Sequence, residues 1–183
     1  MIKRYAVLLL IAMLFASATA QTNSEKASFD LTSAQENEIV NNIKKKFQEI
    51  NNSKNLSIVE KDLSDYSAEG GHLTVFYDGS QLRKIIATYY GETGKVIFEY
   101  YFWADSLIFI FRQLHKYNSS PFYEPSGDSI ALGEPYDHSK TKITEDRFYF
   151  HKNRLVRWID EARNRVDPRS DVFIKSKGNV WEM

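Results

Sequence analysis

The sequence predicts an α+β fold, in which an N-terminal amphipathic helix packs on one antiparallel meander sheet and a short helix follows at the C-terminal end. Three observations carry this prediction. A run of aromatic and β-branched residues extends from His72 to Leu114, polar turns divide that run, and a stretch of helical apolar periodicity precedes it. Aromatic and β-branched residues favour a pleated, half-buried surface. An amphipathic helix needs such a surface to cover.

Polar turns divide the central run into four segments of strand length. Short loops that contain Gly or Asp between runs of this kind are typical of hairpins. The turns are Asp78-Gly79-Ser80, Gly91-Glu92-Thr93-Gly94 and Ala104-Asp105. The expected strands of the meander are Leu73–Tyr77, Gln81–Tyr90, Lys95–Trp103 and Ser106–Leu114. With Leu56–Asp62 before them and Glu145–Phe150 and Arg154–Asp160 after them, the sheet has about six or seven strands.

An amphipathic helix of about five turns is expected before the sheet. Two overlapping capping boxes, Thr32-x-x-Gln35 and Ser33-x-x-Glu36, can start it near Leu31. The apolar residues that recur at helical spacing are Ile39, Val40, Ile43, Phe47 and Ile50. We expect this stripe to cover the sheet. The alternative is a membrane-surface helix, which the acidic residues Glu36, Glu38 and Glu49 disfavour.

The C-terminal part of the chain carries a second helix signal. Asp167-Pro168 is typical of an N-cap followed by proline at the first helical position, which predicts a short helix over Arg169–Lys177. Before it, residues 115–141 contain three prolines and two glycines, so this segment is expected to be a long loop. Long loops within a domain often carry function.

Both faces of the central strands are expected to be apolar. In Lys95–Trp103 the alternation places Val96, Phe98, Tyr100 and Phe102 opposite Ile97, Glu99, Tyr101 and Trp103. In Ser106–Leu114 it places Leu107, Phe109 and Phe111 opposite Ile108, Ile110 and Arg112. A solvated face would instead alternate with polar residues. The helix accounts for one face, and the C-terminal segment, a partner or a ligand is expected on the other.

The first twenty residues have the pattern of a signal peptide. Lys3 and Arg4 precede an apolar stretch from Ala6 to Phe15, and Ala18-Thr19-Ala20 supplies the small residues of a cleavage site. The apolar stretch is shorter than the ~20 residues that a membrane span needs. We therefore expect a signal peptide at 1–20, a disordered leader at 21–30 and one α+β domain at 31–183. The mature protein is expected to be periplasmic or secreted, without a transmembrane segment.

Composition excludes several function classes. Removing residues 1–20 leaves 183 − 20 = 163 residues, and 24 − 2 = 22 bases then face 24 acids, a net charge of −2. A nucleic-acid partner would call for a clustered basic surface, so none is expected. The chain has no Cys, which excludes disulfides, thiolate chemistry, zinc held by Cys and a bacterial lipoprotein anchor.

Three places share one pattern of an aromatic pair, a polar turn and a leucine. They are Val75–Leu82, Tyr101–Leu107 and Tyr149–Leu155. One interpretation is an ancestral repeated hairpin, as in MORN-type arrays of short aromatic hairpins. The other is that aromatic-rich hairpins resemble one another without common ancestry. The irregular spacing and the missing glycine punctuation favour the second interpretation.

The segment Tyr89-Tyr90-Gly91-Glu92-Thr93-Gly94-Lys95, followed by Glu99-Tyr100-Tyr101-Phe102, resembles small exported bacterial proteins of uncharacterised function. Those proteins carry a signal peptide, an N-terminal helix and an aromatic meander. The similarity covers roughly residues 65–160 and consists of hairpin motifs. It therefore implies a fold and a location, and it implies no activity.

No catalytic or cofactor signature is present. The four histidines form no HExxH or similar close pair, so no metal site is predicted; the best candidate is Asp137-His138 with Asp128 or Glu134. No serine lies in a nucleophile elbow, and no glycine-rich phosphate loop occurs. Glu145 and Asp146 are adjacent on a strand and point to opposite faces, so they cannot share one substrate. We expect no enzyme and no cofactor; a hydrolase with a loop-based site is the less favoured alternative.

Binding is the function class that the sequence favours, with a protein or a glycan as the partner. Aromatic side chains on a sheet can stack on sugars or anchor a protein. The candidate ligand-binding residues are Tyr89, Tyr101, Trp103, Arg112 and Trp158; the competing interpretation is that all of them belong to the core. A second hypothesis is a periplasmic inhibitor of an envelope hydrolase that acts through the 117–136 loop. Its candidate residues are Tyr117, Phe122, Tyr123 and Tyr136, and Ser126-Gly127 resembles part of one inhibitor motif.

Overall fold

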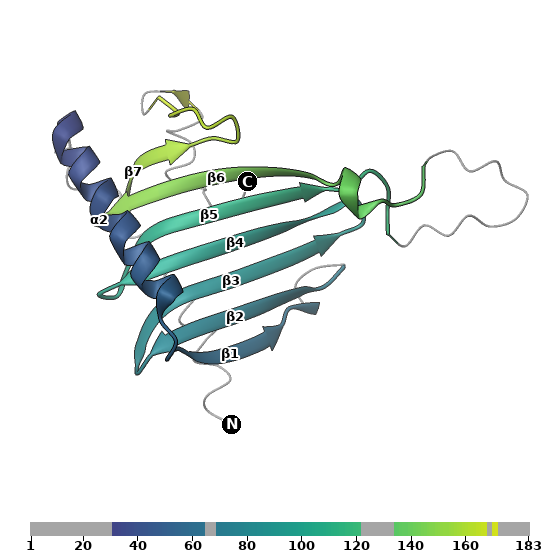
Figure 1. Cartoon of the computed structure of the whole chain (residues 1–183), viewed down its shortest axis with the longest axis horizontal. Coiled ribbons are helices and arrows are strands. Elements are labelled where there is room, and N and C mark those ends of the chain that lie inside the picture. The colour runs from purple at the N-terminus through teal and green to yellow at the C-terminus, as the bar shows by residue number, and fades with distance from the viewer. Residues whose placement is uncertain (1–30, 65–68, 122–133, 168–169, 172–183) are drawn as a thin grey trace, which may run out of the picture. The chain divides into compact units, whose positions relative to one another are not determined.

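The computed structural model describes residues 31–64, 69–121, 134–167 and 170–171. Within them the chain forms one α-helix and a seven-stranded antiparallel sheet, so the predicted α+β class with a β-meander is confirmed (Figure 1). Each strand pairs with the next one along the chain, in the order β1 to β7. The strands are β1 (Ser57–Asp62), β2 (Gly71–Asp78), β3 (Gln81–Gly91), β4 (Gly94–Trp103), β5 (Ser106–Lys116), β6 (Lys142–His151) and β7 (Arg154–Ile159).

Helix α2 (Ser33–Asn52) begins with one of the two expected capping boxes. Thr32 is the N-cap: its hydroxyl accepts from the backbone N–H of Gln35, and the Gln35 side chain accepts from the backbone N–H of Thr32. The Ser33–Glu36 box is not the one used, because the Glu36 side chain turns to the sheet, where only 6% of the residue is exposed. Along the expected stripe, Val40, Ile43 and Ile50 are buried.

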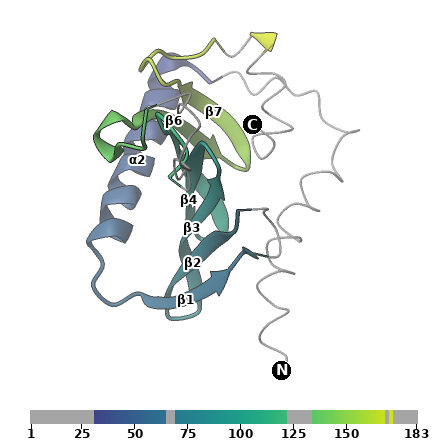
Figure 2. The same cartoon turned by 90° about the vertical axis from the view of Figure 1, so that its right-hand side faces the viewer.

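Helix α2 lies across one face of the sheet, which we call the helix face (Figures 1 and 2). Its first turn reaches β7, where the Arg157 guanidinium donates to Glu36 at 2.6 Å. Its last turns reach β4 and β5: Asn51 bonds the Tyr101 hydroxyl at 3.2 Å, and the Phe47 ring lies 5.5 Å from the ring of Phe109. The helix therefore crosses the strands near the ends at which β2–β3, β4–β5 and β6–β7 turn.

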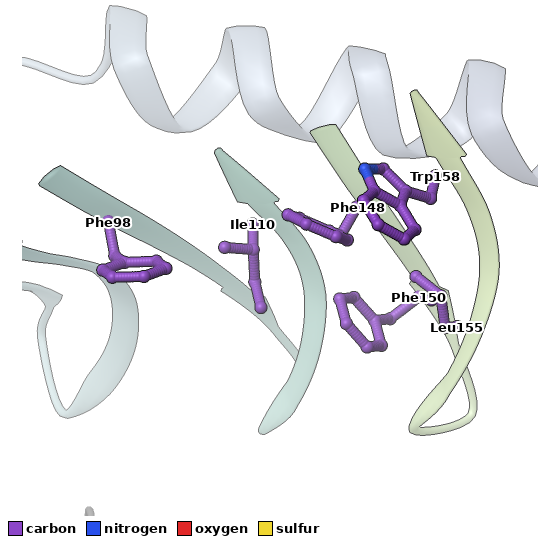
Figure 3. Packing of buried hydrophobic residues seen from close by; sticks show 6 residues of the cluster. All are labelled: Phe98, Ile110, Phe148, Phe150, Leu155 and Trp158. Atoms are coloured by element: carbon purple, nitrogen blue, oxygen red, sulfur yellow. The ribbon is translucent and has the colours of Figure 1, made fainter. Parts of the chain in front are cut away.

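The opposite face of the sheet carries a second apolar core (Figure 3). In it the rings of Phe148 and Trp158 stack with their centroids 5.2 Å apart, and Val166 packs against the cluster from the chain beyond β7. Burying a large apolar side chain contributes roughly 1.5–3 kcal/mol. The buried members are Phe98, Ile110, Phe148, Phe150, Leu155 and Trp158.

The three segments that share a sequence pattern form three hairpins with the same register. In each hairpin the aromatic residue before the turn pairs with the leucine after it: Tyr77 with Leu82, Phe102 with Leu107, and Phe150 with Leu155. Each register then shifts by one residue, which makes a β-bulge at the same place in every hairpin. The turn residues adopt positive φ, as two-residue hairpins of this kind require, at Gly79, Ala104-Asp105 and Lys152-Asn153.

The bulge in the β4–β5 hairpin reverses the expected direction of the Leu107 side chain. Simple alternation placed Leu107 on the same face as Phe109, but Leu107 packs against the cluster that contains Ile110, on the opposite face. Ile108 is the extra residue of the bulge, so the alternation restarts after it. The expected alternation along β4 is confirmed, because Tyr101 contacts Phe47 of α2 while Phe98 belongs to the cluster on the other side.

Several expectations fall on residues outside the described ranges. They include the signal peptide at 1–20, the leader at 21–30 and all of the short helix at 169–177 except Ser170 and Asp171. The long loop is described only at its two ends, up to Pro121 and again from Glu134, where a 3₁₀ turn, η2 (His138–Lys140), precedes β6.

Candidate functional site

The five predicted ligand-binding residues lie on both faces of the sheet. Tyr101 and Trp103 are on the helix face. Arg112 and Trp158 are on the opposite face, and the β3–β4 register places Tyr89 there as well, across from Val96. The structure therefore does not bring the five residues together as one patch.

On the opposite face, Arg112 and Trp158 meet through Asp146. One carboxylate oxygen of Asp146 accepts from the Arg112 guanidinium at 2.8 Å, and the other accepts from the indole N–H of Trp158 at 2.8 Å. Asp146 is 4% exposed, so its charge depends on these two donors. The arrangement satisfies a buried carboxylate and fixes β5, β6 and β7 side by side. Tyr89 is on this face too, and burial raises the pKa of its hydroxyl.

On the helix face, Tyr101 belongs to a polar network beneath α2 and is 1% exposed. Its hydroxyl donates to Glu99 at 2.6 Å, and Glu99 is paired with Lys84 at 2.5 Å. Burial, followed by the bond to Glu99, raises the pKa of Tyr101 above its ordinary value. Trp103 is half-buried and lies between two cations, with Lys46 of α2 at 5.0 Å and Arg83 at 4.6 Å from its ring centroid.

At the base of the long loop, Tyr117 and Tyr136 contact each other edge-on with their ring centroids 5.3 Å apart. Asn118 closes the base, because its side chain donates to the carbonyl of Pro135 and accepts from the backbone N–H of Asp137, both at 2.9 Å. Burial raises the pKa of Tyr117. The other two loop candidates, Phe122 and Tyr123, lie outside the described residues.

The expected metal candidates at this loop are already engaged. Asp137 accepts from Ser139 at 2.7 Å, His138 lies 3.2 Å from the Tyr136 hydroxyl, and Glu134 is paired with Lys140. Asp128 is outside the described residues. Across the described part of the chain, no group of three His, Asp or Glu side chains converges on one point.

An apolar groove lies on the helix face, between helix α2 and strands β5 and β6. We call it the α2 groove, and its volume is about 270 Å³. Its floor is formed by β5 and β6 and its wall by one turn of α2. The lining residues are Ile43, Lys44 and Phe47 from the helix, Phe109 and Phe111 from β5, and Arg147 and Tyr149 from β6.

The inner end of the α2 groove is built from aromatic rings. Phe109 is buried, and its ring centroid lies 5.5 Å from that of Phe47 and 4.9 Å from that of Tyr149. Rings at these separations are in the range of favourable edge and offset contacts. Burial raises the pKa of Tyr149, so its hydroxyl stays neutral. This end therefore offers a ligand apolar surface and one phenol group.

The outer end of the groove is cationic. Phe111 and Arg147 are paired across β5 and β6, and the guanidinium lies 5.0 Å from the Phe111 ring centroid. Arg147 donates to Glu145 at 2.6 Å, and this bond, more than that from Gln113, holds the pKa of the Glu145 carboxyl below its usual range. Lys44, from the helix wall, also lines the groove and is exposed.

Sequence reasoning did not single out the groove residues. The sequence places Phe109 and Phe111 on one face of a strand, and Ile43 and Phe47 on a helix stripe, without marking them as site residues. The missing information was the position at which the helix crosses the sheet. One local signal was present: Lys44 has no acidic residue three or four positions away on either side, whereas Lys45 has Glu49.

No protein-family model, no curated protein and no solved structure matches this chain. In the part of the chain that the structure describes, no helix is long and apolar enough to cross a membrane.

Proposed function

We propose that the mature chain is an exported, non-catalytic binding domain, either free or associated with the cell envelope, and that it holds a small ligand with an apolar body in the α2 groove. Export is supported by the basic, apolar and small-residue segments within residues 1–20. Binding is supported by the groove, where four aromatic rings line a hollow beside the helix. Apolar hollows with a few placed polar groups are typical ligand sites.

The experiment is a titration of the mature chain with N-phenyl-1-naphthylamine, a neutral dye that fluoresces more strongly in apolar surroundings. We expect saturable enhancement for the wild type and at least a fivefold weaker affinity for Phe111→Ser, because Phe111 forms the half-buried part of the floor. The matched control is Ile143→Ser. Ile143 lies on β6 and faces the same side of the sheet as Phe111. It is 51% exposed and does not line the groove.

A urea unfolding midpoint measured for each variant separates loss of the groove from loss of the fold. If the wild type does not bind the dye, or if Ile143→Ser weakens binding as much as Phe111→Ser, the groove is not the binding site and the proposal is overturned.

The closed base of the 117–136 loop favours a second candidate, the inhibitor of an envelope hydrolase. Asn118 and the Tyr117–Tyr136 contact hold the two ends of the loop together, which suits a segment presented to a partner's cleft. Replacing residues 122–133 by a short Gly-Ser linker keeps this base. On this hypothesis the intact chain slows cell-wall lysis by a lysozyme-type hydrolase and the shortened chain does not; equal effects of the two chains would refute it.

A further inference from the structure

We infer that the ligand of the α2 groove is a small aromatic monocarboxylate, with its ring against Phe109 and Tyr149 and its carboxylate between Lys44 and Arg147. The inference rests on the proposed function and adds the chemistry of the ligand.

The charge at the outer end of the groove suits a ligand that carries one negative charge. Two cations, Lys44 and Arg147, line the groove, and one carboxylate, Glu145, pairs with Arg147. Counted over these three side chains alone, the charge is +2 − 1 = +1. Lys44 makes no ion pair within the described residues, and no acid stands one helical turn from it in the sequence. The exposed ammonium group is therefore available to an incoming carboxylate.

Arg147 keeps donors for a ligand. Its guanidinium has five N–H groups in a planar fork, and in the described structure one nitrogen, Nη2, donates to Glu145. The ring of Phe111 lies against the guanidinium, and this contact restricts its orientation. A planar carboxylate suits such a fork, because an arginine can bind both carboxylate oxygens.

The size of the groove suits a compact ligand. Its volume of about 270 Å³ exceeds the ~150 Å³ of an apolar cavity that takes benzene and lies below the ~300 Å³ at which drug-sized sites begin. The inner pair Phe109–Tyr149 and the outer pair Phe111–Arg147 are two residues apart along β5 and β6. That step spans roughly 7 Å. An aromatic ring on the inner pair would therefore place its carboxylate at the outer pair, beside Arg147.

The experiment is displacement of the bound dye from the wild-type chain by phenylacetate, with three comparators of similar size. Phenylacetamide removes the charge, phenethylammonium reverses it, and octanoate replaces the ring by a chain. We expect phenylacetate to bind at least tenfold more tightly than phenylacetamide, and phenethylammonium to bind more weakly than the amide. We also expect phenylacetate to bind more tightly than octanoate.

Two variants test which cations hold the carboxylate. Lys44→Met and Arg147→Gln should each reduce the preference for phenylacetate over phenylacetamide at least threefold. The preference is the ratio of the two affinities within one variant, so a change in dye affinity does not enter it. Lys45→Met is the matched control, since Lys45 is exposed on the same turn and does not line the groove; it should leave the preference unchanged. Raising the salt concentration should also reduce the preference.

The outcomes separate this inference from the proposed function. If the dye binds but the amide competes as well as phenylacetate, the groove does not recognise a carboxylate and the inference is overturned. Tighter binding of octanoate overturns the aromatic part in the same way. If the dye itself does not bind, the proposed function fails, and the inference fails with it.

Discussion

Asp146 is the residue on which the opposite face of the sheet depends most. It is a carboxylate with almost no contact with water, and its oxygens are used by the Arg112 guanidinium and by the indole N–H of Trp158. Burying an ionised carboxylate is unfavourable unless donors replace the lost water. The three side chains come from β5, β6 and β7, so this set of bonds also fixes the order of the last three strands.

Replacing Asp146 by Ala is expected to lower the free energy of unfolding by about 3 kcal/mol, because Arg112 and Trp158 lose their acceptor while they remain largely buried. Urea unfolding measures the change. The matched control is Glu145→Ala. Glu145 directly precedes Asp146 on β6, points to the other face of the sheet and is partly exposed. We expect its effect to stay below about 1 kcal/mol. Similar losses for both variants would contradict this role of Asp146.

Helix α2 is held to the sheet by its apolar stripe and, at its first turn, by a charged contact. The buried Glu36 carboxylate accepts from Arg157 on β7 at 2.6 Å and from Arg165 beyond it. The far end of the helix is held by Asn51, which bonds the Tyr101 hydroxyl. Because the helix forms the wall of the α2 groove, these anchors set the width of the groove.

Glu36→Ala should lower the free energy of unfolding by about 2 kcal/mol, since two arginines lose their carboxylate; the figure is reduced because Arg165 is half exposed. Dye affinity in the groove should fall as well, because the helix loses its anchor to β7. The control Glu38→Ala changes an exposed acid two positions further along the helix and should alter stability by less than about 0.5 kcal/mol. An unchanged midpoint for Glu36→Ala would show that the apolar stripe alone holds the helix.

The repeated hairpin is the clearest regularity at the level of elements. The sequence pattern of aromatic pair, turn and leucine corresponds to three hairpins with the same bulge and the same pairing across the turn. Two-residue turns join the strands in all three hairpins: both turn residues take positive φ at Ala104-Asp105 and Lys152-Asn153, and Gly79 alone does so in the first hairpin.

The stability of the whole molecule should depend on pH through two histidines. Burial, followed by Lys95 and His138, lowers the pKa of His115 below its ordinary 6.5, and burial, followed by Lys152 and Lys46, lowers that of His151. The unfolded chain therefore binds more protons than the folded chain in the window just below pH 6.5. The contribution of the two neutral histidines to the free energy of unfolding is fully present above that window, and it is lost as the pH decreases through it.

We expect the urea midpoint to fall between pH 7.5 and pH 5.5, and we expect His115→Gln to reduce that fall. Lys95→Met should act in the same direction, because it removes one cause of the lowered pKa of His115. A midpoint that rises on acidification, or that falls equally in the wild type and both variants, would contradict this assignment.

The sequence by itself determined the order of the elements, a sheet of about six or seven strands and the helix stripe, because these follow from local turn chemistry and from periodicities of two and 3.6. The expected strand ends agree with the structure to within about two residues except at β6, which begins at Lys142, three residues before the expected Glu145. The tertiary structure alone decided which capping box the helix uses, because Glu36 has distant partners on β7 and beyond it. It also decided the face of Leu107, since one bulge residue reverses alternation. The predicted patch of Tyr89, Tyr101, Trp103, Arg112 and Trp158 is divided between two faces, and the α2 groove exists only where a helix crosses β5 and β6. Such features depend on contacts between residues far apart in the chain, and no local pattern encodes where those residues meet.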